Sequence, residues 1–175
     1  MITSSKVRLC RKRLADAPND YAWKTDPALT QLDASSPLTI TFTEYLLSYA
    51  RELRLSRPNK HEFAIETKDG EHIGNCAYYG INETNGEAEI GIMIGNRQYW
   101  DRDYGSDAVN TLVSHIFSQV KLKRIHLKTL ESNKRAQKCF HKCGFNICGH
   151  MVNNGYSFVL MELYRKQWQQ NRDKF

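Results

Sequence analysis

Hydrophobic residues recur along the chain with two different spacings, and each spacing predicts a different kind of element. At residues 106–120 the apolar side chains return every three or four positions, which places them on one face of a helix. The same spacing predicts helices at residues 41–55 and 133–143, with a short helical stretch around residues 17–23. A polar tail at residues 165–175 is expected to be helical or frayed.

Shorter apolar segments predict strands, and the residues between them predict how the strands are joined. Asp-Gly and Asn-Gly pairs at positions 69–70 and 85–86 favour tight hairpin turns, because these residues tolerate positive φ. The predicted strands are residues 6–11, 61–67, 73–81, 87–94, 124–130, 145–150 and 156–164. We expect the second, third and fourth of these strands to form an antiparallel meander.

The order of these elements is one strand, helices, three strands, helix, strand, helix and two strands. This order predicts an α+β (mixed α/β) fold with one central sheet. The sheet is expected to be twisted and mostly antiparallel, with about seven strands and flanking helices. The chain has 175 residues, of which 41% are hydrophobic and 25% charged, which is ordinary for a globular protein. We therefore expect a single domain over residues 1–175.

Two features of the sequence predict a cytoplasmic protein that does not enter a membrane. No apolar run approaches the ~18–20 residues of a membrane span, and residues 1–13 lack the apolar core of a signal peptide. The five cysteines are odd in number and fit no disulfide framework, which favours a reducing compartment.

Cys139, His141 and Cys143 resemble a metal-binding cluster by their spacing alone. In the predicted helix, however, Cys139 and Cys143 share one face while His141 points elsewhere. Structural zinc requires four converging ligands. We therefore expect no metal, and interpret the two cysteines as small buried apolar residues.

The formal net charge is +6, and the basic residues are concentrated in one part of the chain. Eight basic residues lie between positions 108 and 151, where Glu131 is the only acidic residue. They are Lys121, Lys123, Arg124, Lys128, Lys134, Arg135, Lys138 and Lys142. This segment is either a solvated basic face or a surface that binds a polyanion, such as nucleic acid or a phosphorylated cofactor.

The junction between the strand at residues 87–94 and the next helix is a candidate anion site. The N-terminus of a helix presents free backbone N–H groups and the positive end of the helix dipole. Gly105 would let the backbone approach a phosphate closely. Arg97 and Arg102 lie in the connecting loop and could pair with phosphate oxygens.

Two segments of the sequence resemble the GNAT superfamily of N-acetyltransferases. They are EIGIMIGNRQYWDRDYGSDAV, at residues 89–109, and ESNKRAQKCFHKCGF, at residues 131–145. The order of elements is similar over nearly the whole chain. Within the superfamily, the sequence looks most like the branch that acetylates the N-terminal alanine of ribosomal proteins.

The resemblance implies that acetyl-CoA is the co-substrate, bound in a crevice beside the strand at residues 87–94. Backbone groups of Ile92, Met93 and Ile94, at a bulge in this strand, would align the pantetheine and polarise the thioester carbonyl. The Asn133 side chain would bond the pantetheine arm. The backbone N–H groups of the loop would hold the pyrophosphate at Arg102, Asp103, Tyr104, Gly105 and Ser106.

The sequence departs from the family pattern at three positions near this expected site. Trp100 replaces the polar residue that is usual in the loop. Asp103 replaces a glycine, and its carboxylate should repel the pyrophosphate, although Asp tolerates a left-handed backbone better than most residues. Phe140 stands where many relatives have a tyrosine that protonates the departing thiolate. Phe140 has no proton to give, so the thiolate would take its proton from water, from the amine itself or from another side chain, of which Tyr104 and Ser132 are considered.

Glu89 is the candidate catalytic base, because some family members place their base in this strand. Alternation puts Glu89, Gly91 and Met93 on one face of the strand and the three isoleucines on the other. Glu89 could therefore line a groove near the acetyl group. The alternative is an exposed carboxylate paired with a lysine or arginine.

The sequence thus predicts an N-acetyltransferase in which a primary amine attacks acetyl-CoA directly. A protein N-terminus fits the branch resemblance, while a polyamine, an aminoglycoside or another small amine fits the fold equally. A non-catalytic acyl-CoA-binding domain is the alternative function. Nucleic-acid binding ranks last, because no DNA- or RNA-binding motif is present. The oligomeric state stays open, with a homodimer as one option.

Overall fold

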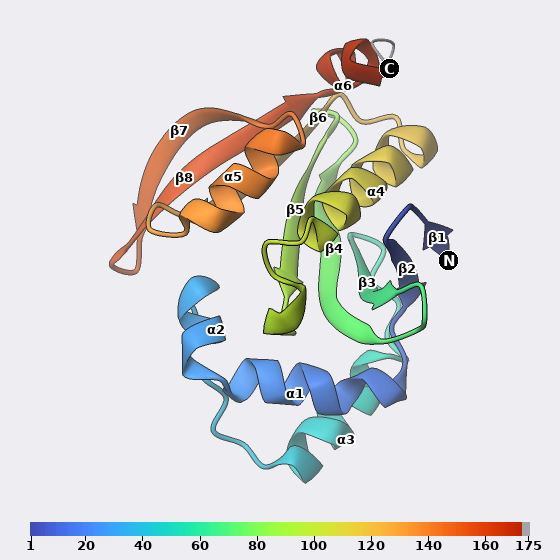
Figure 1. Cartoon of the computed structure of the whole chain (residues 1–175), viewed down its shortest axis with the longest axis vertical. Coiled ribbons are helices and arrows are strands. Elements are labelled where there is room, and N and C mark those ends of the chain that lie inside the picture. Colours follow the sequence, from blue (N-terminus) through green and yellow to red (C-terminus); the bar gives the residue numbers. More distant parts are fainter. Residues whose placement is uncertain (173–175) are drawn as a thin grey trace.

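One continuous sheet organises the chain, and helices pack around it (Figure 1). The computed structural model of the chain describes residues 1–172. Within them the sheet has eight strands in the order β1-β2-β3-β4-β5-β6-β8-β7. The strands are β1 (Ile2–Thr3), β2 (Val7–Arg11), β3 (Lys60–Thr67), β4 (His72–Asn82), β5 (Glu87–Ile94), β6 (Arg124–Leu130), β7 (Asn146–Asn153) and β8 (Tyr156–Tyr164). The helices are α1 (Ala17–Thr25), α2 (Pro27–Leu32), α3 (Phe42–Glu52), α4 (Tyr104–Gln119), α5 (Lys134–Lys142) and α6 (Arg165–Arg172), with short 3-10 helices η1 (Leu14–Asp16) and η2 (Arg97–Tyr99).

The predicted mixed α/β fold with one mostly antiparallel sheet is confirmed. The strands β5, β6 and β8 have the predicted bounds. The strand β1 has only two residues, too few to give a recognisable pattern in the sequence. It brings the number of strands from the predicted seven or so to eight. The predicted helical tail is present as α6, and residues 173–175 of that prediction lie outside the described residues.

The predicted meander of β3, β4 and β5 is antiparallel along its length. Between β4 and β5, Tyr79 lies opposite Glu89, and Tyr78 lies opposite Ile90. Because successive side chains of a strand point to opposite faces, Tyr79 and Glu89 share one face while Tyr78 points to the other. The meander therefore brings a phenol and a carboxylate side by side at a defined position.

The pair β5–β6 is parallel, and it is short. It joins Glu87 to Arg124, Ala88 to Ile125 and Glu89 to His126, and then stops. Beyond Glu89 the two strands diverge, and Figure 1 shows β5 continuing straight while β6, β8 and β7 sweep away from it. The rest of β5, from Ile90 to Ile94, consequently has no strand partner on its β6 side.

The prediction of a bulge at Ile92, Met93 and Ile94 is wrong. Their pairing with β4 is continuous, and the register shift between these strands lies instead between Tyr79 and Asn82. The divergence of β5 from β6 opens the sheet without any extra residue in β5.

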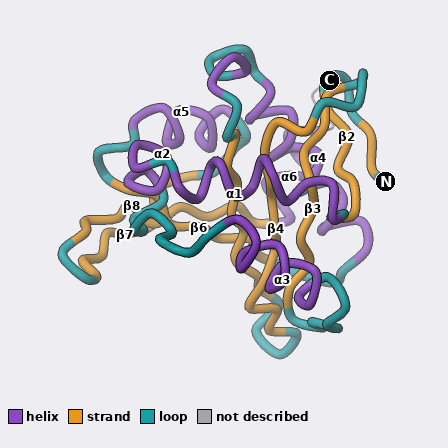
Figure 2. Tube along the Cα trace, turned by 90° about the horizontal axis from the view of Figure 1, so that it is seen from below, coloured by secondary structure: helices purple, strands orange, loops and turns teal. Residues whose placement is uncertain are grey.

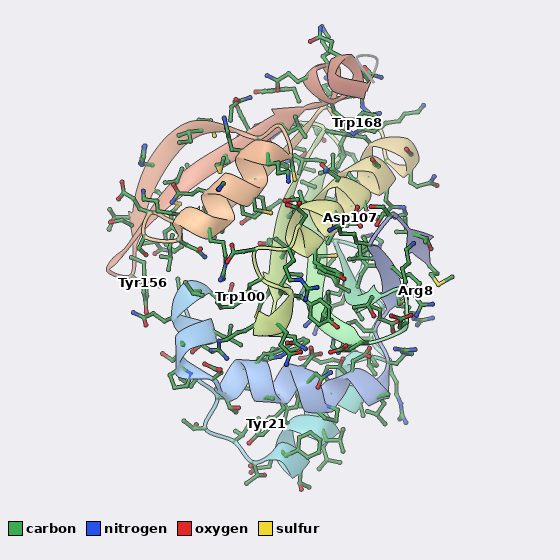
Figure 3. All side chains as sticks on the ribbon, in the orientation of Figure 1. Arg8, Tyr21, Trp100, Asp107, Tyr156 and Trp168 are labelled. Atoms are coloured by element: carbon green, nitrogen blue, oxygen red, sulfur yellow. The ribbon has the colours of Figure 1, made fainter. Side chains whose placement is uncertain are left out.

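The helix α4 packs across the sheet and begins two residues earlier than predicted, at Tyr104. In its first turn, the Asp107 carboxylate accepts hydrogen bonds from the Ser4 and Ser5 hydroxyls and from the backbone N–H groups of Lys6 and Val7. Figure 3 shows Asp107 facing the turn between β1 and β2. Asp107 thereby fixes the start of α4 against the N-terminal strands.

The helices α1 to α3 lie across one end of the sheet, with α2 on the side of α5 and α3 on the opposite side (Figure 2). The helix α2 was not predicted. Asp26 caps it by accepting from the N–H groups of Ala28 and Leu29 at 2.9 and 3.2 Å, and Pro27 occupies its first position. This Asp-Pro pair is a start signal that the apolar spacing alone does not reveal. None of the described helices is both long and apolar enough to cross a membrane.

We expect Gly74→Ala to destabilise the protein by about 1–3 kcal/mol, the usual cost of overpacking a close contact. A methyl group at position 74 would overlap the backbone carbonyl oxygen of Met93, which lies on the neighbouring strand β5 and cannot move alone. Gly149→Ala is the matched control, because its methyl would lie 3.5 Å from Leu160 Cδ1, an ordinary contact. Denaturant unfolding of both variants measures the difference, and equal stabilities would contradict the prediction.

Candidate active site

A cavity of about 460 Å³ lies where β5 and β6 diverge. Residues of β5, β6, α5, the first turn of α4 and the end of α2 line it, together with Tyr79 of β4 and Phe158 of β8. Figure 3 shows Trp100, from the loop before α4, in the space between α5 and α2. The volume falls within the range of about 300–1,000 Å³ that is typical of ligand-binding sites.

The unpaired edge of β5 forms one wall of this cavity through Ile92, Met93 and Ile94. The Trp100 indole N–H donates to the Ile94 carbonyl oxygen at 2.7 Å, so this carbonyl points away from β4. Backbone groups of alternate residues in a strand point the same way, so those of Ile92 also face the cavity. This edge can pair with an extended ligand as another strand would.

The start of α4 forms an anion-binding surface at one end of the cavity. The φ angles of Asp101 and Asp103 are 54° and 65°, so both residues adopt the left-handed backbone that glycine favours. After these two residues the chain enters α4, and Gly105 and Ser106 in its first turn line the cavity wall. The N–H groups of a helix's first turn have no acceptor inside the helix, and together with the helix dipole they can hold a phosphate.

Asp103 lies beside this surface and forms an ion pair with Lys142. Its Oδ1 lies 2.7 Å from the ammonium of Lys142, at the end of α5, and the side chains of both residues are more than half exposed. The hydrogen bond from Lys142 lowers the pKa of Asp103. The expected repulsion between Asp103 and a pyrophosphate is therefore reduced by a neighbouring cation.

The side chains of Arg97, Arg102 and Tyr104 are not brought to the cavity. Arg97 pairs with Asp26 at 2.8 Å. Arg102 donates to the Gln98 carbonyl oxygen at 3.2 Å, and the ring of Tyr104 packs edge-on against Tyr99, with their centroids 4.8 Å apart. The expectation that the two arginine side chains contact phosphate is not supported, since each is engaged elsewhere.

Four other basic side chains line the cavity instead. They are Lys128 of β6 and Arg135, Lys138 and Lys142 of α5. The guanidinium of Arg135 stacks on the Trp100 ring at 3.3 Å from its centroid. These residues belong to the basic segment seen in the sequence, but only the fold shows which of its cations face the cavity.

Asn133 and Phe140 both line the cavity, from opposite ends of α5. Asn133 Oδ1 caps the helix by accepting from the N–H group of Ala136 at 3.2 Å, so its amide NH₂ is not needed for capping. The ring of Phe140 is only 6% exposed and packs edge-on against Phe145. Asn133 thus has a donor to offer, whereas Phe140 offers an apolar surface.

Glu89 lines the cavity at the point where β5 and β6 separate. Its Oε1 accepts a hydrogen bond from the Tyr79 hydroxyl at 3.1 Å and lies 3.8 Å from the ammonium of Lys128. Asp33, directly after α2, also lines the cavity. The structure therefore gathers two carboxylates, a phenol and the ammonium of Lys128 in one part of the cavity.

Neither substitute proton donor considered from the sequence reaches the cavity. Tyr104 packs against Tyr99, and neither Tyr104 nor Ser132 belongs to the cavity wall. Tyr79 does belong to it, whereas Tyr78 stacks on His61 with ring centroids 4.5 Å apart. Because neighbouring side chains of a strand point to opposite faces, only one of these two tyrosines can face the cavity, and it is Tyr79.

Cys139 lies in the cavity wall beside the start of α4, with its Sγ 3.4 Å from the Ser106 hydroxyl. A hydrogen bond from the Cys143 thiol is the main cause that lowers the pKa of Cys139, and Ser106 and Lys142 add to it against the effect of burial. The predicted shared face of the two cysteines is confirmed. Among residues 1–172, no three His, Cys, Asp or Glu side chains gather in a way that could hold a metal ion.

Comparison with known proteins places this geometry in a family. Residues 6–146 match the family described as the acetyltransferase (GNAT) domain. The uncharacterized N-acetyltransferase p20 of Bacillus licheniformis is 27% identical over 144 residues, which are 81% of this chain and 80% of that protein. The spermine/spermidine N(1)-acetyltransferase of Bacillus subtilis is 25% identical over 100 residues, covering 54% of this chain and 66% of that protein.

Two solved structures share the fold over nearly their whole length. The spermidine N-acetyltransferase of Vibrio cholerae, in complex with CoA and spermine, has a TM-score of 0.81 at 18% identity and covers 95% of this chain and 99% of its own. The aminoglycoside acetyltransferase AAC(6')-Ib, in complex with coenzyme A, has a TM-score of 0.79 at 21% identity, with the same coverage. No ribosomal-protein acetyltransferase is among these relatives, so the branch expected from the sequence is not supported.

We expect the Cys139 thiol to react with iodoacetamide at a rate that rises through a midpoint below the ~8.5 of an ordinary cysteine, because the hydrogen bond from Cys143 lowers the pKa of Cys139. Alkylation should slow when acetyl-CoA occupies the adjacent surface. Mass spectrometry of the peptide that contains Cys139, sampled over time from pH 5.5 to 9.5, measures the rate. A midpoint near the ~8.5 of an ordinary cysteine would contradict the prediction.

Proposed function

The chain belongs to the acetyltransferase (GNAT) domain family, and from this premise we propose that it acetylates a primary amine of a small cationic molecule. The protein is an acetyl-CoA-dependent N-acetyltransferase that acts on amines. The observation that carries the proposal about the acceptor is the position of Asp33 and Glu89, which both line the cavity and whose negative charges both act on Tyr79 in its wall.

The donor occupies the α4–α5 side of the cavity in this proposal. Its pyrophosphate lies against the N–H groups at the start of α4, near the cations of α5. The pantetheine arm runs along the unpaired edge of β5 and bonds the backbone of Ile92 and the amide of Asn133. These contacts direct the thioester toward Glu89, because the edge of β5 leads from Ile94 back to that residue.

The acceptor enters from the side of α2. A cationic amine is attracted by Asp33 and Glu89, and Leu29 and Leu32 of α2 supply apolar surface for a carbon chain. Two of the relatives in sequence and structure are described as spermine or spermidine acetyltransferases, which supports an acceptor of this chemistry.

Glu89 acts as the base in the proposed reaction. An alkyl ammonium has a pKa of ~10.4 and must lose a proton before it can attack. The ammonium gives this first proton to solvent, and Glu89 takes a second proton from the nitrogen as it bonds to the thioester carbon. The tetrahedral intermediate then breaks its C–S bond, releasing the acetylated amine and the thiolate of coenzyme A. The Ile92 backbone N–H, which faces the cavity, can stabilise the oxyanion.

A panel of amines tests the acceptor, with thiol release from acetyl-CoA as the measurement. We expect kcat/KM to be highest for polyamines or aminoglycosides and at least tenfold lower for a peptide with a free N-terminal alanine. The control is a monoamine of similar length whose chain carries no second charge. It should react more slowly because it leaves one of the two carboxylates unpaired. A preference for the peptide would contradict the small-molecule proposal and favour a protein N-terminus.

We expect Glu89→Gln to lower kcat at saturating amine by about 10²-fold or more, since a general base contributes about 10²–10⁴-fold. Glu87→Gln is the matched control on the same strand. Glu87 pairs with Arg124 at 2.8 Å and is not part of the cavity wall, so its loss should leave kcat nearly unchanged. A decrease of less than tenfold for Glu89→Gln would exclude direct base catalysis by this residue.

A further inference from the structure

The proposed reaction ends with a thiolate that needs a proton, and the residue at the usual donor position is Phe140. Its ring is 6% exposed and carries no exchangeable hydrogen. The hydroxyls in the cavity wall are those of Tyr79, Tyr99, Ser106 and Thr129. Tyr99 donates to Glu71 at 2.5 Å, and Ser106 is engaged with Cys139 at 3.4 Å.

Tyr79 differs from these residues because its hydroxyl contacts the proposed base. The Tyr79 oxygen lies 3.1 Å from Glu89 Oε1, and the two residues are register partners on β4 and β5. The phenol lies over Gly91, where a Cβ would be 3.7 Å from the hydroxyl and 3.6 Å from Cε1. Since Gly91 has no side chain, the hydroxyl reaches the wall of the cavity next to Ile92, where the thioester is proposed to lie.

We propose that Tyr79 is the general acid that protonates the thiolate of coenzyme A, in place of the tyrosine that is missing at Phe140. This inference rests on the proposed function. The amine proton passes to Glu89 as the N–C bond forms. As the C–S bond breaks, the Tyr79 hydroxyl gives its proton to sulfur, and the protonated Glu89 returns one proton to the phenolate. Both residues finish as they began, and one proton has moved from nitrogen to sulfur.

The surroundings of Tyr79 keep its hydroxyl protonated until this step. Burial is the main cause that raises the pKa of Tyr79, and the negative charge of Glu89 raises it further. The phenol is therefore protonated throughout the neutral range. When Glu89 gains the amine proton, the negative charge that disfavours a phenolate disappears, so Tyr79 becomes a stronger acid at the moment the thiolate leaves.

Tyr79→Phe tests the proposal, because it removes only the hydroxyl. We expect kcat to fall by about 10²-fold with the best amine, with KM for acetyl-CoA changed by less than about threefold. Tyr78→Phe is the matched control. It makes the same chemical change one residue away, on the opposite face, where Tyr78 stacks on His61. Its kcat should equal that of the wild type, and a thermal melt of each variant checks that it is folded.

A second variant separates proton donation from support of the fold. Tyr79→Ala leaves a space of the shape of the lost ring, and added phenol should restore part of its kcat, more so for more acidic phenols. Toluene, which has the same shape and no acidic proton, should restore nothing. Equal rescue by toluene and phenol, or a Tyr79→Phe enzyme with more than one third of wild-type kcat, would overturn the role of Tyr79. Wild-type protein that releases no thiol with any amine would instead overturn the proposed function, and this inference with it.

Discussion

The loss of pairing between β5 and β6 after Glu89 is the constraint on which the rest of the site depends. The parallel pair β5–β6 has three register partners, and beyond them the two strands diverge. Their divergence leaves backbone donors and acceptors of β5 without partners, which is unfavourable unless a ligand or side chain binds them. At the Ile94 carbonyl oxygen, the Trp100 indole N–H supplies the missing hydrogen-bond donor. The remaining free edge makes this part of the sheet a binding surface instead of a continuous wall.

Charged side chains of both signs line the cavity, and three of its cations are grouped on α5. Arg135, Lys138 and Lys142 line the wall together with Asp101 and Asp103 of the loop before α4. Glu89 lines it with the ammonium of Lys128 3.8 Å from its Oε1. A cofactor with several phosphates would be attracted by the cations of α5. The formal net charge of +6 contains none of this information, because a sum over the chain does not record which side chains face the cavity.

The sequence predicted the elements that follow from local spacing, and it failed where tertiary contacts decide. The bounds of β5 and β6 follow from apolar runs between turns, and Asn133 was found by resemblance at the start of α5. The positions of Arg97 and Arg102 could not be predicted, since their partners Asp26 and Gln98 depend on how the loop folds back. The inward face of β4 became known only from its register with β5, and Tyr79 was until then equivalent to its neighbour.

The departures of this chain from its family pattern are compensated within the same structure. Asp103, which replaces a glycine, adopts the backbone that glycine favours at a small conformational cost, as does Asp101, and both add negative charge beside the anion-binding surface. Lys142 pairs with Asp103 at 2.7 Å. Burial lowers the pKa of Arg135, and the nearby Asp101 opposes this effect. Because both cations come from α5, binding of phosphate at the start of α4 would compete with the aspartates for them. The loop and α5 are thus coupled, so a change at either one alters donor binding through the other.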